Sequence, residues 1–254
     1  MKRGGLTREG WIRLAVVVAF VLAFELLCRL GVLPRTVVLP PSEMATSLWH
    51  LLETGEFTAD IVSTLQDVAI ASALSIALGF ALGIAIHALP RLRATLEPLL
   101  ASYYAIPTFM FYPVFIVVFG VSDRAIIAIA VLLSIVAMIA STLTGLDRIP
   151  RVLRKTAAIY RMGLARRALL IDLPAAAPHL FTGIKLAFAY AFIGVIASEF
   201  ILSGQGIGYQ IAYAYNNFEN RKMYGLMLLV IIVATVANAV LDTIDRRLQS
   251  RLRR

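Results

Sequence analysis

The sequence predicts an all-α integral membrane protein, a single domain of residues 1–254 with six transmembrane helices. Composition is the first reason, because 60% of the 254 residues are hydrophobic and only 15% are charged, far from the balance of soluble globular domains. Length is the second, because the apolar runs are long enough to cross a hydrocarbon core of about 30 Å at about 1.5 Å of rise per helical residue. The runs also lack the strict alternation of β-barrel strands, which favours helices.

Six apolar runs are expected to form the transmembrane helices. They cover residues 11–30, 61–89, 99–119, 125–143, 180–202 and 223–244. The first run follows several basic residues, as a signal peptide would. However, it contains Glu25 and Arg29, and Leu39-Pro40-Pro41 follows it instead of a small-residue cleavage site. We therefore expect this run to be retained, with Glu25 and Arg29 paired at a spacing of i to i+4.

Basic residues concentrate on one side of the predicted topology. With the N-terminus inside the cell, most of the 24 Lys and Arg fall at the two termini, after the second span, and in residues 148–180 between the fourth and fifth spans. Lys and Arg favour cytoplasmic loops, so both termini and the loop of residues 148–179 are predicted to be cytoplasmic. The same topology accounts for the net charge of +9 without nucleic acid as a partner.

The chain offers little for catalysis or metal binding. The three histidines, at positions 50, 87 and 179, have no metal-ligand spacing, and Cys28 has no second cysteine to pair with. Asp242 and Asp245 lie three apart, but two arginines follow at once, which favours a charge-balanced helix end over a metal pair. The GQGIG stretch at residues 204–208 follows an apolar run instead of a strand, and no GxxxxGK[ST] motif occurs. We predict no catalytic residue, cofactor or metal in this chain.

Several polar side chains lie within the apolar runs. Pro107 and Pro113 should kink or break the third span, where Tyr104 and its neighbours supply hydroxyls able to line a cavity. Ordinary helix packing explains these residues equally well. Glu199 is the most informative acid, because an ionisable group in an apolar span usually faces the interior or a partner. The predicted translocation path comprises Tyr103, Tyr104, Pro107, Thr108, Ser198 and Glu199.

Residues 148–180, RIPRVLRKTAAIYRMGLARRALLIDLPAAAPHL, interrupt the apolar chain with a basic segment. Pro150 suits a helix start, and apolar residues between positions 152 and 168 fall along one side, which predicts an amphipathic helix. Two interpretations stay open, an interfacial helix on anionic lipid and a docking helix for a cytoplasmic partner. Pro174 and Pro178 are expected to end the helical region before the fifth span.

Four stretches occur in the order outer loop, third span, inner loop and fifth span. They are LPPSEM at residues 39–44, IPTFMFYPVFIVVFG at 106–120, AAIYRMG and LIDLPAAAP within 157–178, and ASEFILSGQGIGYQI at 197–211. Together they resemble the permease subunits of bacterial ABC importers, in the group that includes nitrate, sulfonate and taurine transport.

The inner stretch resembles the EAA loop of that family, which reads Glu-Ala-Ala, three residues, Gly, then Leu-Pro. Gly163 takes the place of the Gly, Ala158 that of the first Ala, and residues 173–174 that of the Leu-Pro. The chain departs from the pattern at Ala157, which stands for the Glu, and in a shorter interval before the Leu-Pro. An ungapped match would instead put Arg161 at the Gly position. The resemblance implies an ATPase-coupling surface made of Ala157, Ala158, Ile159, Tyr160, Arg161, Met162 and Gly163.

The resemblance implies a type I ABC importer permease of the bacterial inner membrane, with a coupling helix between the fourth and fifth spans. Its implied partners are two ATPase subunits carrying ATP and Mg, a second permease copy in a homodimer, a soluble solute-binding protein, and the lipid bilayer. The transported solute would be small and anionic or polar. An integral membrane enzyme would need clustered nucleophile, base or metal ligands. A secondary transporter would usually show internal repeats and more intramembrane charge.

Overall fold

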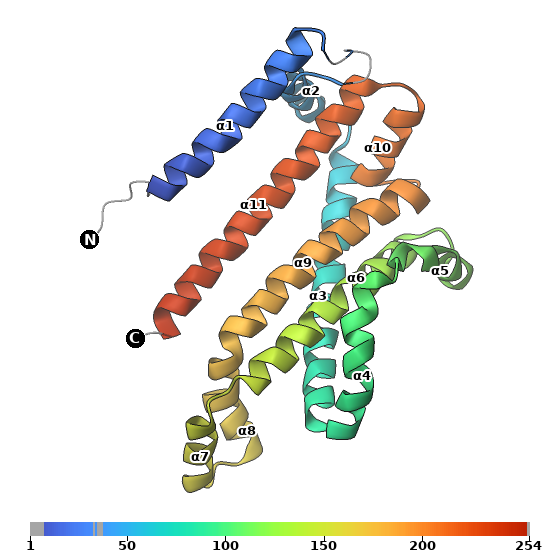
Figure 1. The fold of residues 1–254 in the computed structure, drawn as a ribbon. Coiled ribbons are helices and arrows are strands. Elements are labelled where there is room, and N and C mark those ends of the chain that lie inside the picture. Colours follow the sequence, from blue (N-terminus) through green and yellow to red (C-terminus); the bar gives the residue numbers. More distant parts are fainter. Residues whose placement is uncertain (1–7, 33, 35–37, 253–254) are drawn as a thin grey trace. The chain divides into compact units, whose positions relative to one another are not determined.

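A computed structural model describes residues 8–32, 34 and 38–252, and every regular element within these ranges is helical (Figure 1). The elements are α1 (Arg8–Arg29), α2 (Pro41–Thr54), α3 (Thr58–Ala88), α4 (Pro90–Ser102), the 3-10 turns η1 (Tyr103–Ala105) and η2 (Thr108–Phe111), α5 (Tyr112–Phe119), α6 (Asp123–Asp147), α7 (Arg151–Ile159), α8 (Leu164–Arg167), the π-turn η3 (Ala168–Asp172), α9 (Leu173–Leu202), α10 (Ile207–Asn216) and α11 (Asn220–Leu252). The predicted all-α class is confirmed for the described residues.

Several of these helices are long and apolar enough to cross a membrane. Within the described ranges they are Gly10–Arg29, Thr58–Ala88, Asp123–Asp147, Leu164–Leu202 and Asn220–Arg247. A further crossing results if the bent pair Pro90–Ala105 and Thr108–Phe119 counts as one span. Each predicted run overlaps one of these segments, and the count of six spans stays a prediction.

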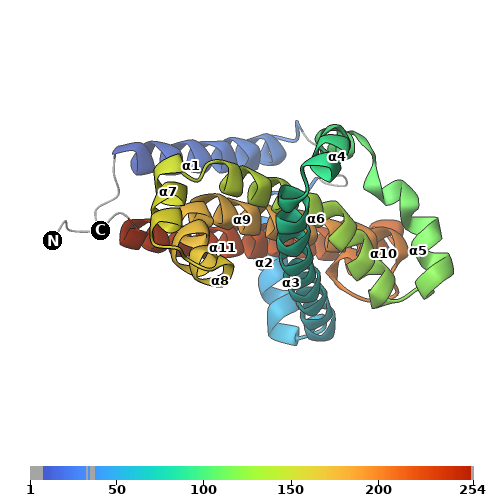
Figure 2. The same cartoon turned by 90° about the horizontal axis from the view of Figure 1, so that it is seen from below.

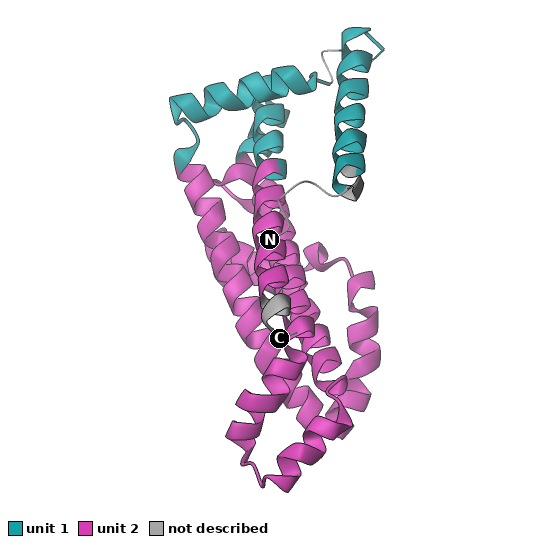
Figure 3. Ribbon diagram, turned by 90° about the vertical axis from the view of Figure 1, so that its left-hand side faces the viewer, with its two compact units in different colours: residues 1–58, 210–231 teal, residues 59–209, 232–254 magenta. Residues whose placement is uncertain are grey.

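The chain divides into two compact units (Figure 3). Unit 1 comprises residues 1–58 and 210–231, and unit 2 comprises residues 59–209 and 232–254. In unit 1, the Glu25 carboxylate accepts hydrogen bonds from Arg29 Nε at 2.6 Å and from the Ser42 hydroxyl at 2.7 Å. The predicted pairing of Glu25 with Arg29 is confirmed, and Ser42 ties it to the start of α2.

Unit 2 is built around α3, α6 and α9, which approach one another through small residues. A Cβ added to Gly79 of α3 would lie 2.7 Å from Cβ of Met138 in α6, and one added to Gly183 of α9 would lie 2.6 Å from Cβ of Ser141. Lipid tails are as apolar as the helix surfaces, so close backbone packing of this kind is what holds membrane helices together.

The fifth span begins further upstream than predicted. We expected Pro174 and Pro178 to end the helical region, but α8, η3 and α9 form one continuous helical stretch, Leu164–Leu202. Pro174 lies in the first turn of α9, directly after the π-turn, and Pro178 lies inside the helix. The wider π-turn leaves room for a proline ring and needs fewer regular i to i−4 hydrogen bonds. The prediction that these prolines end the helix was therefore wrong, and the π-turn supplies the reason at Pro174.

The basic segment is shorter as a helix than predicted. Pro150 precedes α7 as expected, but α7 ends at Ile159 and the chain reverses before α8. Arg161 takes the left-handed conformation, with φ at 47°, and Met162 N donates to Ala157 O at 3.0 Å. Figure 1 and Figure 2 both show α7 and α8 side by side beyond the ends of α6 and α9. The single helix predicted up to residue 168 is therefore two short helices joined by a tight reversal.

Candidate functional site

The third predicted span is broken next to Pro107. Its two halves, Pro90–Ala105 and Thr108–Phe119, bend by 95° relative to each other. Ile106 has extended backbone angles, φ −87° and ψ 120°, which a following proline favours. The predicted break is confirmed at this position. The same prediction for Pro113 was wrong, because Pro113 lies in the first turn of α5, where a proline fits a helix and does not interrupt it.

A cavity of about 260 Å³ in unit 2 lies beside Tyr104, in the turn that precedes the break. The Tyr104 and Tyr190 rings are stacked along one part of it, with centroids 5.3 Å apart and planes at 27°. Tyr103 points elsewhere, because its hydroxyl donates to Leu132 O of α6 at 2.6 Å. The polar side chains that line this cavity are Tyr104, Ser141, Thr144, His179, Thr182 and Tyr190.

The polar groups in the cavity lining divide into two sets. The Thr144 and Thr182 hydroxyls donate to backbone carbonyls one turn earlier in their own helices, at 2.8 and 3.0 Å. The side chains in the other set make no hydrogen bond to any residue in the part of the chain that the structure describes; they are Tyr104, Ser141, His179 and Tyr190. Tyr104 is exposed and the other three are half-buried, so a molecule in the cavity can reach their polar groups. The cavity therefore offers accessible hydrogen-bonding groups to water or to a solute.

The Glu199 carboxylate is buried near the other end of α9, with 1% of the residue exposed. Its Oε2 accepts hydrogen bonds from the Thr64 hydroxyl at 2.9 Å and from Gly208 N at 2.8 Å. The Thr64 oxygen in turn accepts a hydrogen bond from Ile207 N at 2.8 Å. Within the described residues, Glu199 Oε1 and the buried Ser198 hydroxyl have no such partner. Glu199 thus joins α9, α3 and the turn that follows α9.

The glycines of the GQGIG turn allow it to lie against this carboxylate. A Cβ on Gly206, where φ is +96°, would overlap the Glu199 carboxyl group, and a Cβ on Gly208 would overlap Ile196 O. Gly206 N also donates to Asp60 Oδ1 at 2.7 Å, and Gln205 Nε2 to Asp123 Oδ1 at 3.0 Å. The turn is consequently fastened to the starts of both α3 and α6. We call the residues Thr64, Glu199, Gly206, Ile207 and Gly208 the carboxylate cluster.

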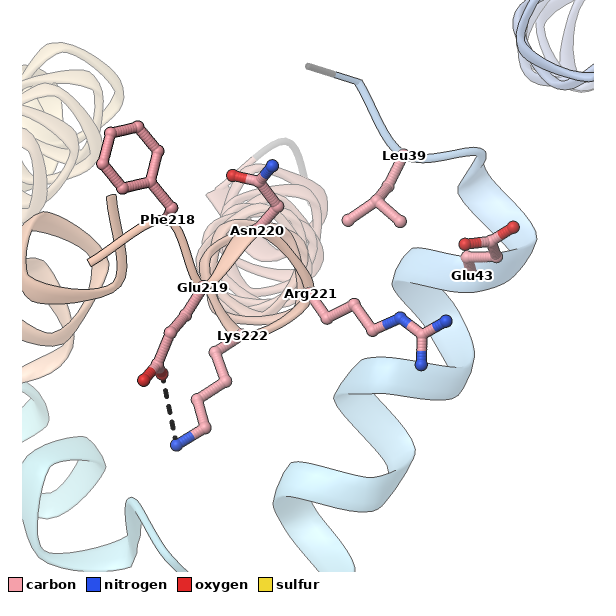
Figure 4. A pocket seen from close by; sticks show the side chains of 7 residues that line it. All are labelled: Leu39, Glu43, Phe218, Glu219, Asn220, Arg221 and Lys222. Atoms are coloured by element: carbon pink, nitrogen blue, oxygen red, sulfur yellow. Dashed lines mark ion pairs between the residues drawn. The ribbon is translucent and has the colours of Figure 1, made fainter. Parts of the chain in front are cut away.

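Unit 1 contains a separate pocket of about 540 Å³ at the start of α11 (Figure 4). Lys222 Nζ lies 3.3 Å from Glu219 Oε2 and 3.0 Å from Glu56 Oε1, so its charge is balanced. Glu43 and Arg221 also line the pocket, and in the view of Figure 4 the Arg221 side chain extends toward Glu43. Acidic and basic groups are thus mixed in the pocket.

Residues 157–163 form the end of α7 and the reversal toward α8. Ala157 is buried, whereas Ile159 and Tyr160 are 78% and 73% exposed. A Cβ on Gly163 would meet no atom within 4 Å. The reversal therefore presents two large apolar side chains on a surface that has free space beside Gly163, a shape suited to contact with another protein.

Sequence reasoning missed three of the unpaired residues in the cavity: Ser141, His179 and Tyr190. A signal was available on α9, where positions 179, 182, 186 and 190 recur at helical spacing and all line the cavity. The pattern was inconclusive alone, because only the packing of α9 against α6 brings Ser141 to the same place. Of the residues predicted for the translocation path, Tyr104 lines this cavity, while Glu199 belongs to the carboxylate cluster.

The residues of the cavity, the carboxylate cluster from α9 onward, and the α7–α8 reversal all fall within one match to a known family. Residues 75–254 match the family model described as binding-protein-dependent transport system inner membrane component. The chain belongs to this family. It is a membrane-spanning permease subunit of an ABC importer, and the resemblance found in the sequence is confirmed.

Curated relatives of this permease cover most of its length. It is 24% identical over 97% of its residues, and 90% of the relative, to a putative aliphatic sulfonates transport permease protein, SsuC, of Bacillus subtilis. It is 28% identical over 74% of its residues, and 67% of the relative, to a nitrate import permease protein, NrtB, of Leptolyngbya laminosa. A bicarbonate transport system permease protein, CmpB, of Synechococcus elongatus is 28% identical over 73% of this chain and 66% of its own.

A solved structure has the same fold. Inward-facing MetNI methionine ABC transporter contains a chain that aligns with a TM-score of 0.65 at 17% identity, covering 76% of this permease and 95% of that chain. The permease therefore has the fold of a type I importer subunit. Family and fold together place it in an importer with an ATPase and a binding protein. Within the described part of the permease, no group of three or more His, Cys, Asp or Glu side chains is arranged to hold a metal ion.

Proposed function

We propose that this permease moves a small, anionic or polar solute into the cytoplasm after a soluble binding protein delivers it to the outer face. The observation that carries this proposal is the cavity beside Tyr104, where several polar side chains without a protein partner line a space between apolar spans. Transporters commonly place solute sites next to broken helices in this way. The relatives named for sulfonates, nitrate and bicarbonate make small anions the first solutes to examine.

The energy for transport would come from two separate ATPase subunits that bind ATP and Mg. The chain has no GxxxxGK[ST] motif of its own. We propose that the ATPase contacts residues 157–163, because Ile159 and Tyr160 are exposed there and Gly163 leaves room for close approach. Large apolar side chains beside a small residue can insert into a partner cleft.

Both termini and the loop of residues 148–179 would face the cytoplasm, as the distribution of Lys and Arg favours. Cysteines introduced singly on a Cys28→Ala background test this orientation. A membrane-impermeant thiol reagent applied outside intact cells should label a cysteine at Thr54 or Asn217 and spare one at Arg151 or Gln249. The reverse pattern would invert the topology and remove residues 157–163 from the reach of an ATPase.

We also propose that two copies of the permease form the path as a homodimer. Tyr104, which lines the cavity, is 47% exposed in a single chain, so a neighbouring copy is one way to close this space within the membrane. The mass of the permease in lipid nanodiscs, measured together with cross-linking through single cysteines, tests the stoichiometry. A monomer in the purified, transport-active importer would contradict the homodimer.

Reconstitution tests the function as a whole. The permease would be placed in liposomes with its partner ATPase and binding protein, and supplied with radiolabelled ethanesulfonate, nitrate, bicarbonate or taurine. Uptake of at least one solute should require ATP, the permease and the binding protein. Uptake that proceeds without ATP hydrolysis, driven by an ion gradient, would instead indicate a secondary transporter.

Two substitutions test the coupling surface. Gly163→Arg and Ala158→Trp add bulk where close protein contact is proposed, and overpacking costs about 1 to 3 kcal/mol. Membrane insertion should survive, while recovery of the ATPase with the permease and solute-stimulated ATP hydrolysis should fall. Gly204→Arg is the matched control, because a Cβ there also meets nothing within 4 Å. If both variants kept the ATPase and lost affinity for anionic liposomes, the segment would be an interfacial lipid-binding element.

A further inference from the structure

The cavity beside Tyr104 has a lining whose chemistry is unusually uniform. Its side chains carry hydroxyls, two tyrosine rings, one imidazole and aliphatic groups, and among the described residues no Asp, Glu, Lys or Arg lines it. The Tyr104, Tyr190 and Ser141 hydroxyls each carry a proton to donate, and His179 carries at least one N–H in either protonation state. The two threonine hydroxyls of the lining already donate to backbone carbonyls. The groups left without a partner are therefore hydrogen-bond donors without a fixed charge.

Donors of this kind discriminate between classes of solute. A cation would lose its hydration in a space that supplies no carboxylate to replace it, which is strongly unfavourable in a low-dielectric site. An oxyanion presents several acceptor oxygens and can take one hydrogen bond from each donor, with charge assistance that makes each bond stronger than a neutral one. The absence of Lys and Arg from the lining also keeps the anion from binding too tightly to leave.

We propose that Tyr104, Tyr190, Ser141 and His179 form a binding site for a small oxyanion, held by neutral hydrogen-bond donors instead of a positive side chain. This inference rests on the proposed function and specifies the solute chemistry of its cavity. The rings of Tyr104 and Tyr190 stack on each other and both line the site, and the packing of α6 on α9 brings Ser141 and His179 to the same cavity.

A purely structural role explains these side chains less well. Ser134 lies on α6 two turns before Ser141 and is fully buried, with its hydroxyl 2.5 Å from that of Ser75 and 2.6 Å from Ala130 O. Ser134 is thus buried and paired, whereas Ser141 is half-buried, lines the cavity and has no described hydrogen-bond partner. The two serines lie on the same helix and differ in access to the cavity, which makes them a matched pair for an experiment.

Thiol labelling of the full-length permease in nanodiscs tests the site directly. On a Cys28→Ala background, Ser141→Cys should react with a water-soluble methanethiosulfonate reagent, and Ser134→Cys should not. Sodium nitrate and sodium ethanesulfonate should slow the reaction of the cysteine at position 141 by a factor of 1 + [L]/Kd, about tenfold at ten times Kd. Choline chloride at equal ionic strength should leave the rate unchanged. Thr182→Cys, at a second lining position, replaces Ser141→Cys if that variant does not fold.

A second experiment removes the tyrosine hydroxyls that are proposed to donate hydrogen bonds to the anion. Tyr104→Phe combined with Tyr190→Phe keeps both rings and removes both hydroxyls. The anion concentration that halves the labelling rate of the cysteine at position 141 should rise by roughly tenfold for each lost hydrogen bond. Tyr112→Phe, outside the cavity lining, is the control and should not change it. Protection by choline, no protection by either anion, or no shift in the double variant would each overturn the proposal. Failure of ATP-driven uptake in the complete importer would instead count against the proposed function.

Discussion

The carboxylate cluster and the cavity beside Tyr104 are two polar regions within the apolar helices of unit 2, and they differ in where their partners come from. In the carboxylate cluster, the Thr64 hydroxyl and the Gly208 N–H donate hydrogen bonds to a buried acid, and Ile207 N donates to the Thr64 oxygen. In the cavity, Tyr104 and the other unpaired groups have no partner within the described chain. Polarity in a membrane span is therefore a weak indicator of a transport path, and accessible polar groups that face a cavity are a better one.

The comparison predicts different consequences for mutations in the two regions. Loss of a group in the carboxylate cluster should destabilise the fold, because another group in the chain is then left buried and unpaired. Loss of a hydroxyl in the cavity should leave stability nearly unchanged and alter the interaction with the solute. Folding and transport measured on the same variants therefore separate the two regions.

Gly208→Ala should cause the largest loss of stability. The added Cβ would overlap Ile196 O and lie 2.7 Å from Cβ of Glu199, so α9 or the turn must move. Overpacking of this kind costs about 1 to 3 kcal/mol, measurable as a lower midpoint of denaturation for the purified permease in detergent. Gly204→Ala, in the same turn but with nothing within 4 Å of the new Cβ, should change it by less than about 0.5 kcal/mol. Equal effects of the two would mean that the turn is not packed on the carboxylate.

Thr64→Val should be the next largest in effect. Valine keeps the shape of the side chain but removes the oxygen that accepts from Ile207 N and the proton that Glu199 Oε2 receives. A buried donor left unpaired costs about 1 to 3 kcal/mol. Thr243→Val is the control, because the Thr243 hydroxyl is exposed and bonds only to a carbonyl of its own helix among the contacts described. A loss no greater than that of the control would show that the cluster contributes little to folding.

Sequence patterns predicted what is local along the chain. The apolar runs indicated the helices, Pro107 indicated the break, and the spacing of Glu25 and Arg29 indicated their ion pair. Where a prediction failed, the structure at that position depended on neighbouring turns or on other helices. Pro174 was expected to end a helix, but the preceding π-turn accommodates it.

Contacts between helices could not be predicted from one sequence. Asp242 and Asp245 were expected to form a charge-balanced helix end with the arginines that follow them. The structure adds Lys185 of α9, whose Nζ lies 3.0 Å from an oxygen of each acid. The cavity and the carboxylate cluster are of the same kind, since each gathers side chains from different helices. Helical periodicity places a residue on a face, but it does not specify which helix covers that face.

Tyr104→Phe combined with Tyr190→Phe should have almost no effect on stability, which is the opposite of the result for Thr64→Val. Both rings remain and can stack at 5.3 Å, and no described hydrogen bond is lost. We expect a change within about 0.5 kcal/mol in the denaturation midpoint, the range of substitutions that break no packing or buried pairing. A loss as large as that of Thr64→Val would show that the hydroxyls have structural partners and would remove the contrast between the two regions.

Glu199→Gln should have a modest effect on folding, and it tests whether a residue of the carboxylate cluster also serves transport. The glutamine carbonyl can take the place of Oε2 and still accept from Thr64 and Gly208 N, so the denaturation midpoint should stay within about 1 kcal/mol. The amide nitrogen then takes the place of Oε1, the one carboxylate oxygen without a described partner. An acid within an apolar span is unfavourable unless it is paired or hydrated. We therefore expect that an acid occupies position 199 because the carboxyl group takes part in transport. ATP-driven uptake into proteoliposomes should therefore fall while the ATPase is still recovered with the permease. Unchanged uptake would assign Glu199 wholly to helix packing, and a large loss of stability would mean that the negative charge itself holds the GQGIG turn in place.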